Sequence, residues 1–295
     1  MPRFMRTLGL TLALMLGVGA AIVYVLSERR LGRRYPVPAP SVSARTDSVA
    51  LARGQHLYRT ITCATCHAAD GGGAIYADEG SIGIMAGPNL TSGRGGVAPL
   101  RSDADWARAI RHGVRQDSTS LIVMPSEVFT HLSDADLSAL LGWLRHLPPV
   151  DRELPSSRFR WLGRALLAAG RLNILVAPKT PPEANRAGVT QAPTADYGRY
   201  LADISGCHGC HGYGLSGGTV AGPPGLPPAS NLTPAGLSGW TAARFADVMR
   251  TGRRTDGSTL DEFMPWKEFR HMTDDDLMAL WLYLQSVPAR PFGGK

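Results

Sequence analysis

The stretches "CATCH", residues 63–67, and "CHGCH", residues 207–211, contain all four cysteines of this 295-residue chain. Each stretch reads Cys-x-x-Cys-His, and no cysteine lies elsewhere in the sequence. The fold must therefore present the same three side chains twice, at two places far apart along the chain.

This spacing is typical of the covalent attachment of c-type haem. Two intervening residues within a helical turn place both sulfurs against the vinyl groups of one haem, and the following histidine is directed at the iron. We therefore predict two covalently bound haem c groups. The predicted attachment residues are Cys63, Cys66 and His67 for one haem, and Cys207, Cys210 and His211 for the other.

Two other kinds of site use the same cysteine pair. A thioredoxin-like redox pair lies in a βαβ pattern, which this sequence does not show. A zinc site could combine two cysteine pairs, but it would not require a histidine directly after each pair. Haem attachment explains all six residues.

The chain also contains an internal repeat. Residues 124–148 and 264–288 are identical at eleven of 25 positions without a gap, and both begin with Met-Pro. Shorter matches precede them, such as Asn89-Leu90-Thr91 with Asn231-Leu232-Thr233. The sequence therefore predicts two copies of one domain, at residues 45–150 and 195–295.

Each copy is predicted to end in a helix that begins at Ser133 or at Thr273. An aspartate follows three residues after each of these N-cap residues, as in a capping box. Leucines then recur at helical spacing and give each helix one apolar stripe. Because no stretch shows convincing strand alternation, we predict an all-α fold.

Residues 151–194 connect the two domains and are too long for an ordinary connection within a compact domain. They include an apolar stretch with several arginines, residues 158–178. Two interpretations remain open: this stretch packs against the haem domains, or it forms a docking surface for a partner subunit or the membrane.

The net charge of +7 is concentrated at the N-terminus. Residues 1–34 contain six arginines and one glutamate, giving +6 − 1 = +5 and leaving +2 for the rest of the chain. Arginines on both sides of an apolar stretch are typical of a membrane-spanning segment. The charge distribution therefore gives no support for nucleic-acid binding.

Residues 8–26 carry no charge. At about 1.5 Å per residue they span roughly 28 Å, close to the hydrocarbon thickness of a bilayer. A cleaved signal peptide has a shorter apolar core and a small-residue cleavage site, whereas this stretch runs into Ser-Glu-Arg-Arg. We therefore expect an uncleaved single-pass anchor within residues 1–34. Arginines on both flanks leave its orientation open.

The attachment motifs, the paired Met-Pro sequences and the final helices together resemble class I c-type cytochromes, over about residues 48–150 and 195–290. The resemblance implies that a methionine before the last helix binds the iron opposite the histidine. The implied metal ligands are His67, Met124, His211 and Met264. Four other methionines have no paired counterpart in the repeat: Met85, Met249, Met272 and Met278.

The resemblance also implies several supporting residues. Gly54 and Gly198 correspond to the glycine where the first and last helices cross. Gly87-Pro88 corresponds to a loop whose carbonyl accepts the proximal histidine N–H, and in the second copy four prolines are candidates for this role: Pro223, Pro224, Pro227 and Pro228. Arg111 and Arg250 are candidates for contacts with haem propionates or for solvated surface positions.

The implied function is electron transfer without catalytic residues, because His/Met ligation fills both axial positions of the iron. Attachment of c-type haem takes place outside the cytoplasm in this family, which implies haem domains on the periplasmic side of the inner membrane. The expected partners are a dehydrogenase, a quinol-oxidising complex or a terminal oxidase, and the cytochrome subunits of periplasmic dehydrogenases are similar. The alternative is a dihaem cytochrome c peroxidase, in which one haem has an open position.

Overall fold

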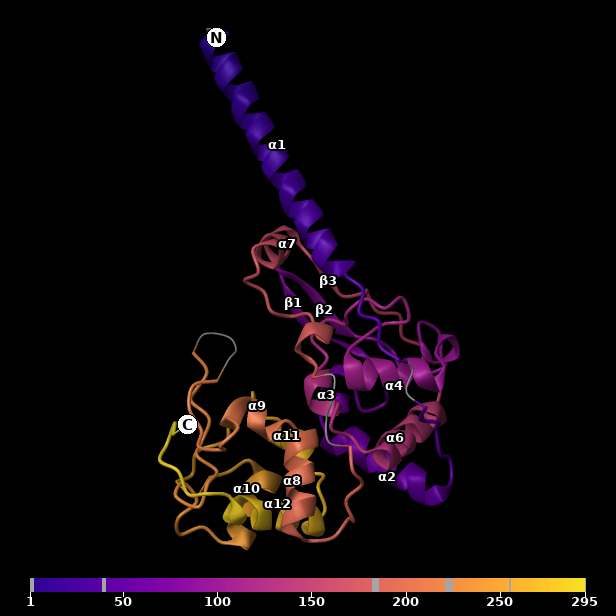
Figure 1. Ribbon diagram of the computed structural model, residues 1–295, viewed down its shortest axis with the longest axis vertical. Coiled ribbons are helices and arrows are strands. Elements are labelled where there is room, and N and C mark those ends of the chain that lie inside the picture. Colours follow the sequence, from indigo (N-terminus) through magenta and orange to yellow (C-terminus); the bar gives the residue numbers. More distant parts are fainter. Residues whose placement is uncertain (1–2, 39–40, 182–185, 221–224, 255, 295) are drawn as a thin grey trace.

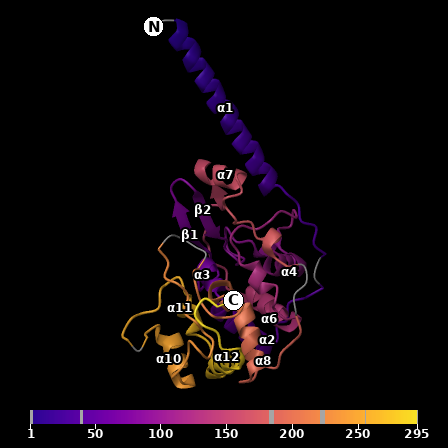
Figure 2. The same cartoon turned by 60° about the vertical axis from the view of Figure 1, so that its left-hand side comes forward.

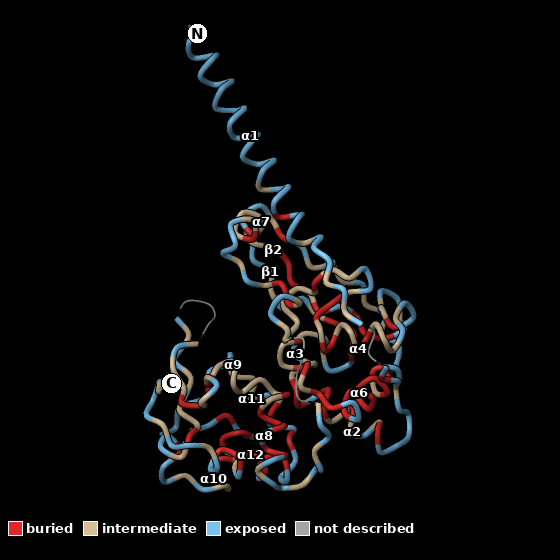
Figure 3. Tube along the Cα trace, in the orientation of Figure 1, coloured by how far each residue is buried: buried red, intermediate tan, exposed pale blue. Residues whose placement is uncertain are grey.

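The computed structural model describes residues 3–38, 41–181, 186–220, 225–254 and 256–294. A long N-terminal helix, α1 (Arg3–Leu31), projects away from two small domains that lie side by side (Figures 1 and 2). Figure 3 shows that α1 is exposed along almost its whole length, whereas the helices of both domains have buried faces.

The two domains contain the same helices in the same order. Domain 1 consists of α2 (Ser48–Thr60), α3 (Cys63–His67), α4 (Asp103–His112), α5 (Ser126–Phe129) and α6 (Asp134–His146). Domain 2 consists of α8 (Ala195–Ile204), α9 (Cys207–His211), α10 (Ala242–Thr251), α11 (Trp266–Phe269) and α12 (Asp274–Ser286). The predicted repeat is therefore a repeat of structure.

The first and last helices of each domain cross at a glycine, as expected. A Cβ atom on Gly54 would collide with the Ala139 carbonyl oxygen, and one on Gly198 would collide with that of Ala279. Only glycine allows α2 to approach α6, and α8 to approach α12, this closely. The final helices also begin where predicted, because the Ser133 hydroxyl accepts the Asp136 backbone N–H and the Thr273 hydroxyl accepts the Asp276 backbone N–H.

The all-α prediction was incomplete, because domain 1 also contains strands. β1 (Ala74–Glu79) and β2 (Gly83–Gly87) form an antiparallel hairpin, and β3 (Arg158–Phe159) pairs with β2. A register shift between Ile75 and Ala77 interrupts the alternation of side chains along β1. Such a bulge removes the two-residue period by which strands are recognised in a sequence.

The segment that follows domain 1 packs against that domain and against the C-terminal end of α1. It supplies β3 and α7 (Trp161–Ala168), which lies beside the end of α1 (Figures 1 and 2). A small apolar cluster joins the hairpin, this segment and Leu31 of α1; its buried members are Met85, Phe159, Leu167 and Leu175. The packing interpretation is thus correct for this part of the connection, with domain 1 and α1 as the surfaces contacted.

A buried polar network joins the two domains. The Asp136 carboxylate accepts hydrogen bonds from Arg53 of its own domain, at 2.6 Å and 2.8 Å, and from the Tyr200 hydroxyl of domain 2, at 2.7 Å. The Asp276 carboxylate accepts one from Tyr197 of its own domain at 2.9 Å and lies 2.8 Å from His56 Nε2 of domain 1. Each carboxylate therefore has partners from both domains.

This network follows a pseudo-twofold axis. Arg53 directly precedes the crossing glycine of domain 1, as Tyr197 does in domain 2. His56 and Tyr200 each lie two residues after that glycine, so they are equivalent as well. Arg53 also donates to the Tyr197 hydroxyl at 3.0 Å, so these two equivalent residues meet at the axis. The domains consequently use the same face toward each other, as the subunits of a symmetric dimer do.

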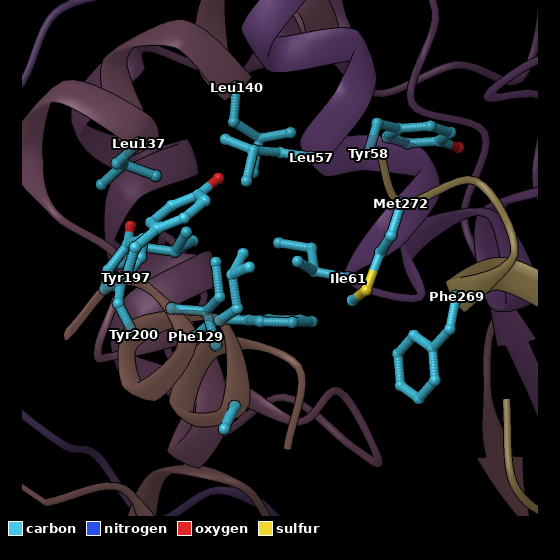
Figure 4. Close-up of a cluster of buried hydrophobic side chains, with 14 of the residues drawn as sticks. Leu57, Tyr58, Ile61, Phe129, Leu137, Leu140, Tyr197, Tyr200, Phe269 and Met272 are labelled. Atoms are coloured by element: carbon cyan, nitrogen blue, oxygen red, sulfur yellow. The ribbon is translucent and has the colours of Figure 1, made fainter. Parts of the chain in front are cut away.

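Apolar side chains from both domains surround the network and form one continuous core. Figure 4 shows Tyr197 and Tyr200 of domain 2 beside Leu137 of domain 1, and Met272 of domain 2 beside Ile61 of domain 1. The two domains therefore form one packed body rather than two units held only by their connection.

Replacing Tyr200 by phenylalanine should destabilise this interface. The change removes the hydrogen bond to Asp136 and the one that the Ser133 N–H donates to the Tyr200 oxygen at 3.1 Å. Leaving these buried groups with fewer partners should lower the free energy of unfolding by about 1–3 kcal/mol, measured by denaturant titration of the haem-loaded protein. Tyr213→Phe is the control, because Tyr213 is 97% exposed. Equal stability of both variants would contradict the structural importance of the network.

The interface should also weaken in acid. Burial alone would raise the pKa of Asp276, but hydrogen bonds from His56 and Thr273 outweigh it and lower that pKa from 3.8 to about 2. A depressed carboxyl pKa contributes stability above pH 3.8 that is lost as the pH falls toward 2, here about 2 kcal/mol. The difference in unfolding free energy between the native protein and Asp276→Asn should therefore shrink over this interval. A difference independent of pH would contradict the assignment.

Candidate functional site

The first attachment motif forms its own short helix, α3, directly after α2. Thr62, which precedes it, has a left-handed backbone with φ of 68° that turns the chain between the two helices. His67 Nδ1 lies 3.0 Å from the Pro88 carbonyl oxygen, as expected for the Gly87-Pro88 loop. This bond leaves Nε2 available as a metal ligand, and burial lowers the pKa of the imidazole, which favours its neutral form.

A cavity of about 570 Å³ opens beside α3 in domain 1. Cys63, Cys66, His67 and Met124 all line it, so the four residues singled out in the first copy come together around one space. Apolar side chains from several elements complete its wall, including Ile61, Leu90, Ile110, Phe129, Leu140 and Leu154. This volume is in the range of cofactor pockets.

The remaining methionines lie elsewhere. Met85 belongs to the small cluster beside the hairpin, and Met249 and Met272 are buried in the main core. Met278 on α12 is 40% exposed. None of these four is among the residues that line the cavity of domain 1.

The second motif forms α9 with the same local geometry. Gly206, which precedes it, has a φ of 74°, and His211 Nδ1 lies 2.8 Å from the Ser230 carbonyl oxygen. Met264 packs half-buried against the main core.

The expectation of a proline carbonyl in the second copy was wrong, because Ser230 supplies the acceptor. Pro227 and Pro228 do not have this role, and Pro223 and Pro224 lie outside the described residues. The repeat contains the signal that would have identified the residue: Pro88 precedes Asn89-Leu90-Thr91, and Ser230 precedes the matching Asn231-Leu232-Thr233.

Arg111 has a structural role. Its side chain is almost completely buried, donates to the Leu132 carbonyl at 2.6 Å and forms an ion pair with Asp134 at 2.7 Å. Arg250 makes the equivalent contacts with the Arg270 carbonyl and Asp274. These arginines fix the start of the final helices, so neither the propionate role nor the solvated one describes Arg111.

Other cationic residues lie at the cavity instead. Arg101 and Arg115 line it, and Arg115 donates to the Ser120 carbonyl. Arg254 makes the corresponding contact with the Thr259 carbonyl in domain 2. Arg115 and Arg254 are four residues after Arg111 and Arg250, so an extension of the repeat would have found this pair.

The cavity fits a large apolar group with a polar edge. Its lining is mainly apolar, yet Trp106 presents a buried Nε1–H with no hydrogen-bond partner among the described residues. None of the four cysteines is in a disulfide, so all four are available for thioether bonds, and burial raises the pKa of the Cys63 and Cys207 thiols to about 12. Among the described residues no three His, Cys, Asp or Glu side chains converge on one point, so the geometry of a shared zinc site is not present there.

One residue of domain 2 reaches the cavity of domain 1. Pro265, which directly follows Met264, is part of the cavity wall. Around the pseudo-twofold axis, Val128 of domain 1 lies against Gly206 at the start of α9. The segments that follow the two paired methionines therefore contact the opposite domain near its attachment helix.

Family comparisons match each domain separately. A model described as cytochrome c oxidase, cbb3-type, subunit III, matches residues 49–144, and a model described as cytochrome c matches residues 195–288. A relative named as a diheme c-type cytochrome, from Cereibacter sphaeroides, is 28% identical and aligns over 93% of this chain and 98% of its own length. The chain is a dihaem c-type cytochrome. It carries two covalently bound haem c groups.

Other relatives of this cytochrome are subunits of dehydrogenases. The cytochrome c subunit of the quinone-dependent alcohol dehydrogenase of Gluconobacter oxydans is 26% identical over 84% of this chain and 56% of its own length. The cytochrome subunit of fructose dehydrogenase from Gluconobacter japonicus is 25% identical over 89% of this chain and 57% of its own length. The chain thus spans a little over half the length of these relatives.

Replacing Gly87 by alanine should disturb the first haem of the cytochrome. A Cβ atom at this position would collide with the Cys66 carbonyl oxygen and displace the loop that holds His67. The ratio of covalent haem to protein, measured as the pyridine haemochrome, should fall below two, because domain 2 is unaffected. Gly80→Ala is the control, since no atom lies within 4 Å of its added Cβ. Two haems with native potentials in Gly87→Ala would contradict the need for this close contact.

Proposed function

We propose that this cytochrome is a membrane-anchored electron relay between a donor dehydrogenase on the periplasmic side and a membrane-bound or soluble acceptor. The observation that carries the proposal is the pairing of two closely similar haem sites across one packed interface. An electron-transfer protein can use two closed sites of one kind, whereas a peroxidase needs its two sites to differ.

The proposed haem contacts follow from the repeat and from the cavity lining. Cys63, Cys66 and His67 hold the first haem with Met124 as the second axial ligand. The corresponding residues of domain 2 are Cys207, Cys210, His211 and Met264. The haem groups supply a one-electron couple between ferric and ferrous iron, and the protein determines the potential, orientation and access of each group.

The side chains around the sites have separate tasks in this proposal. The Pro88 and Ser230 carbonyls hold the two imidazoles in one orientation, which limits rearrangement when the oxidation state changes. The apolar wall of the domain 1 cavity excludes water from the metal environment. The interdomain network fixes one site relative to the other, and Pro265 closes the first cavity from the side of the second domain.

The proposed anchor is α1, within residues 1–34. Among the described residues it is the one helix long and apolar enough to cross a membrane, a test that a signal sequence near the N-terminus would also pass. Its uncharged stretch continues directly into Ser27 and Glu28, which contact α7. A segment with tertiary contacts to the folded domain supports an anchor that is retained, with the haem domains on the periplasmic face of the inner membrane.

The proposed donor is a dehydrogenase, because the alcohol and fructose dehydrogenase relatives are named as cytochrome subunits of such enzymes. The proposal also allows a quinol-oxidising complex or a terminal oxidase as a redox partner. No catalytic residue is assigned to this chain itself.

Replacing Met124 or Met264 by alanine should open one haem in each case. Loss of a thioether ligand destabilises ferrous iron, so one midpoint potential should fall while the other changes little. The near-infrared ferric iron–thioether absorption should fall to half, measured against total haem. Met278→Ala is the control because Met278 is half-exposed on α12. An unchanged spectrum in either ligand variant would refute that assignment.

The same absorption separates the relay from the peroxidase alternative. Two methionine-ligated haems per chain in the oxidised native protein, without reaction toward peroxide, support the relay. One methionine-ligated haem together with a peroxide-dependent change at the other would refute it.

A further inference from the structure

Helix α7 is attached to the end of α1 by specific contacts. Arg164 of α7 forms an ion pair with Glu28 at 2.6 Å and donates to the Ser27 hydroxyl at 3.1 Å. Its guanidinium also lies 4.9 Å from the centre of the Tyr24 ring. Ser27 is buried although almost all of α1 is exposed, which indicates that α7 covers this part of the helix.

These contacts fix the position of α7 along the axis of α1. The apolar stretch of α1 ends at Leu26, and the residues contacted by Arg164 are on either side of this point. If residues 8–26 span the hydrocarbon, α7 lies at the level of the lipid headgroups. Figures 1 and 2 both show α7 at the end of the folded body nearest to the anchor.

The two faces of α7 differ. Gly163 and Leu167 are buried against the hairpin and β3, where a Cβ on Gly163 would collide with the Ile82 carbonyl oxygen. Trp161 is 68% exposed and Leu162 is 37% exposed. A tryptophan at the boundary between water and hydrocarbon is favourable, because the indole has an apolar body and one polar N–H.

The segments that adjoin α7 are rich in arginine. The exposed arginines of the two adjoining segments are Arg29, Arg30, Arg33, Arg34, Arg158 and Arg171. The nearby acids are largely neutralised, since Glu28 pairs with Arg164 and Asp78 pairs with Arg160. Glu79 is the further acid of the hairpin. The excess of arginine is complementary to phospholipid phosphates.

We propose that α7 is an interfacial helix that inserts Trp161 and Leu162 into the headgroup layer of the leaflet on the side of the haem domains. The helix thereby holds domain 1 against the membrane at a fixed height and orientation. This inference rests on the proposed anchor. The occupant is lipid rather than protein, because α7 is attached to α1 where the apolar stretch ends and the adjoining segments carry an excess of exposed arginine.

The test uses the full haem-loaded chain in phospholipid nanodiscs that contain phosphatidylglycerol. A photoreactive benzoylphenylalanine replaces Trp161, or Leu14 as the positive control, or Tyr213 as the negative control. Leu14 is 68% exposed on α1, and Tyr213 is 97% exposed and follows α9 in domain 2. Because all three side chains are exposed, the replacements leave the core intact. Adducts are identified by mass spectrometry after irradiation.

We expect lipid adducts at positions 14 and 161 and none at position 213. Lipid adducts at position 14 without any at 161 would overturn the inference and leave the anchor intact. Adducts of position 161 with a second copy of the chain, or with another protein when native membranes are irradiated, would overturn it in favour of a protein interface. The absence of lipid adducts at position 14 would refute the anchor itself, and the inference with it.

Discussion

Two buried carboxylates, Asp136 and Asp276, determine how this molecule is assembled. A carboxylate removed from water is costly unless hydrogen bonds and opposite charge compensate it. Neither domain completes that compensation alone, since Asp136 takes Tyr200 and Asp276 takes His56 from the opposite domain. Both aspartates lie in the first turn of a final helix, and the Asp276 carboxylate also completes a capping box with Thr273.

Much of the repeated unit could be predicted from the sequence because its causes are local. Glycine at a close helix crossing, a hydroxyl before a final helix and the attachment motif each leave a short pattern. The interface between the domains leaves no such pattern in the sequence, because the equivalent positions 53 and 197 carry unrelated side chains, arginine and tyrosine. The two copies satisfy the same carboxylate with different donors, and only the folded arrangement reveals the pairing.

The differences between the copies explain most of what the sequence reasoning missed. The hairpin lies in domain 1, β3 lies in the segment that follows it, and the bulge in β1 interrupts the period of that strand. They connect domain 1 to α7 and α1 through the small apolar cluster. In domain 2, Ala229 and Ser230 occupy the positions of Gly87 and Pro88. The acceptor for His211 is a backbone carbonyl, which any residue can provide, so a search for proline did not find it.

These connections form a continuous path from α1 through α7 and domain 1 to the interface and domain 2. A connection as long as residues 151–194, if it were free, would allow the second domain many positions relative to the first. A network of charged and hydroxyl groups restricts this freedom more than an apolar contact does, because a small displacement leaves buried groups without partners. The pairing of Arg53 with Tyr197 at the axis admits one register. A relay whose rate depends on the separation of its two sites benefits from this constraint even if the network adds little net stability.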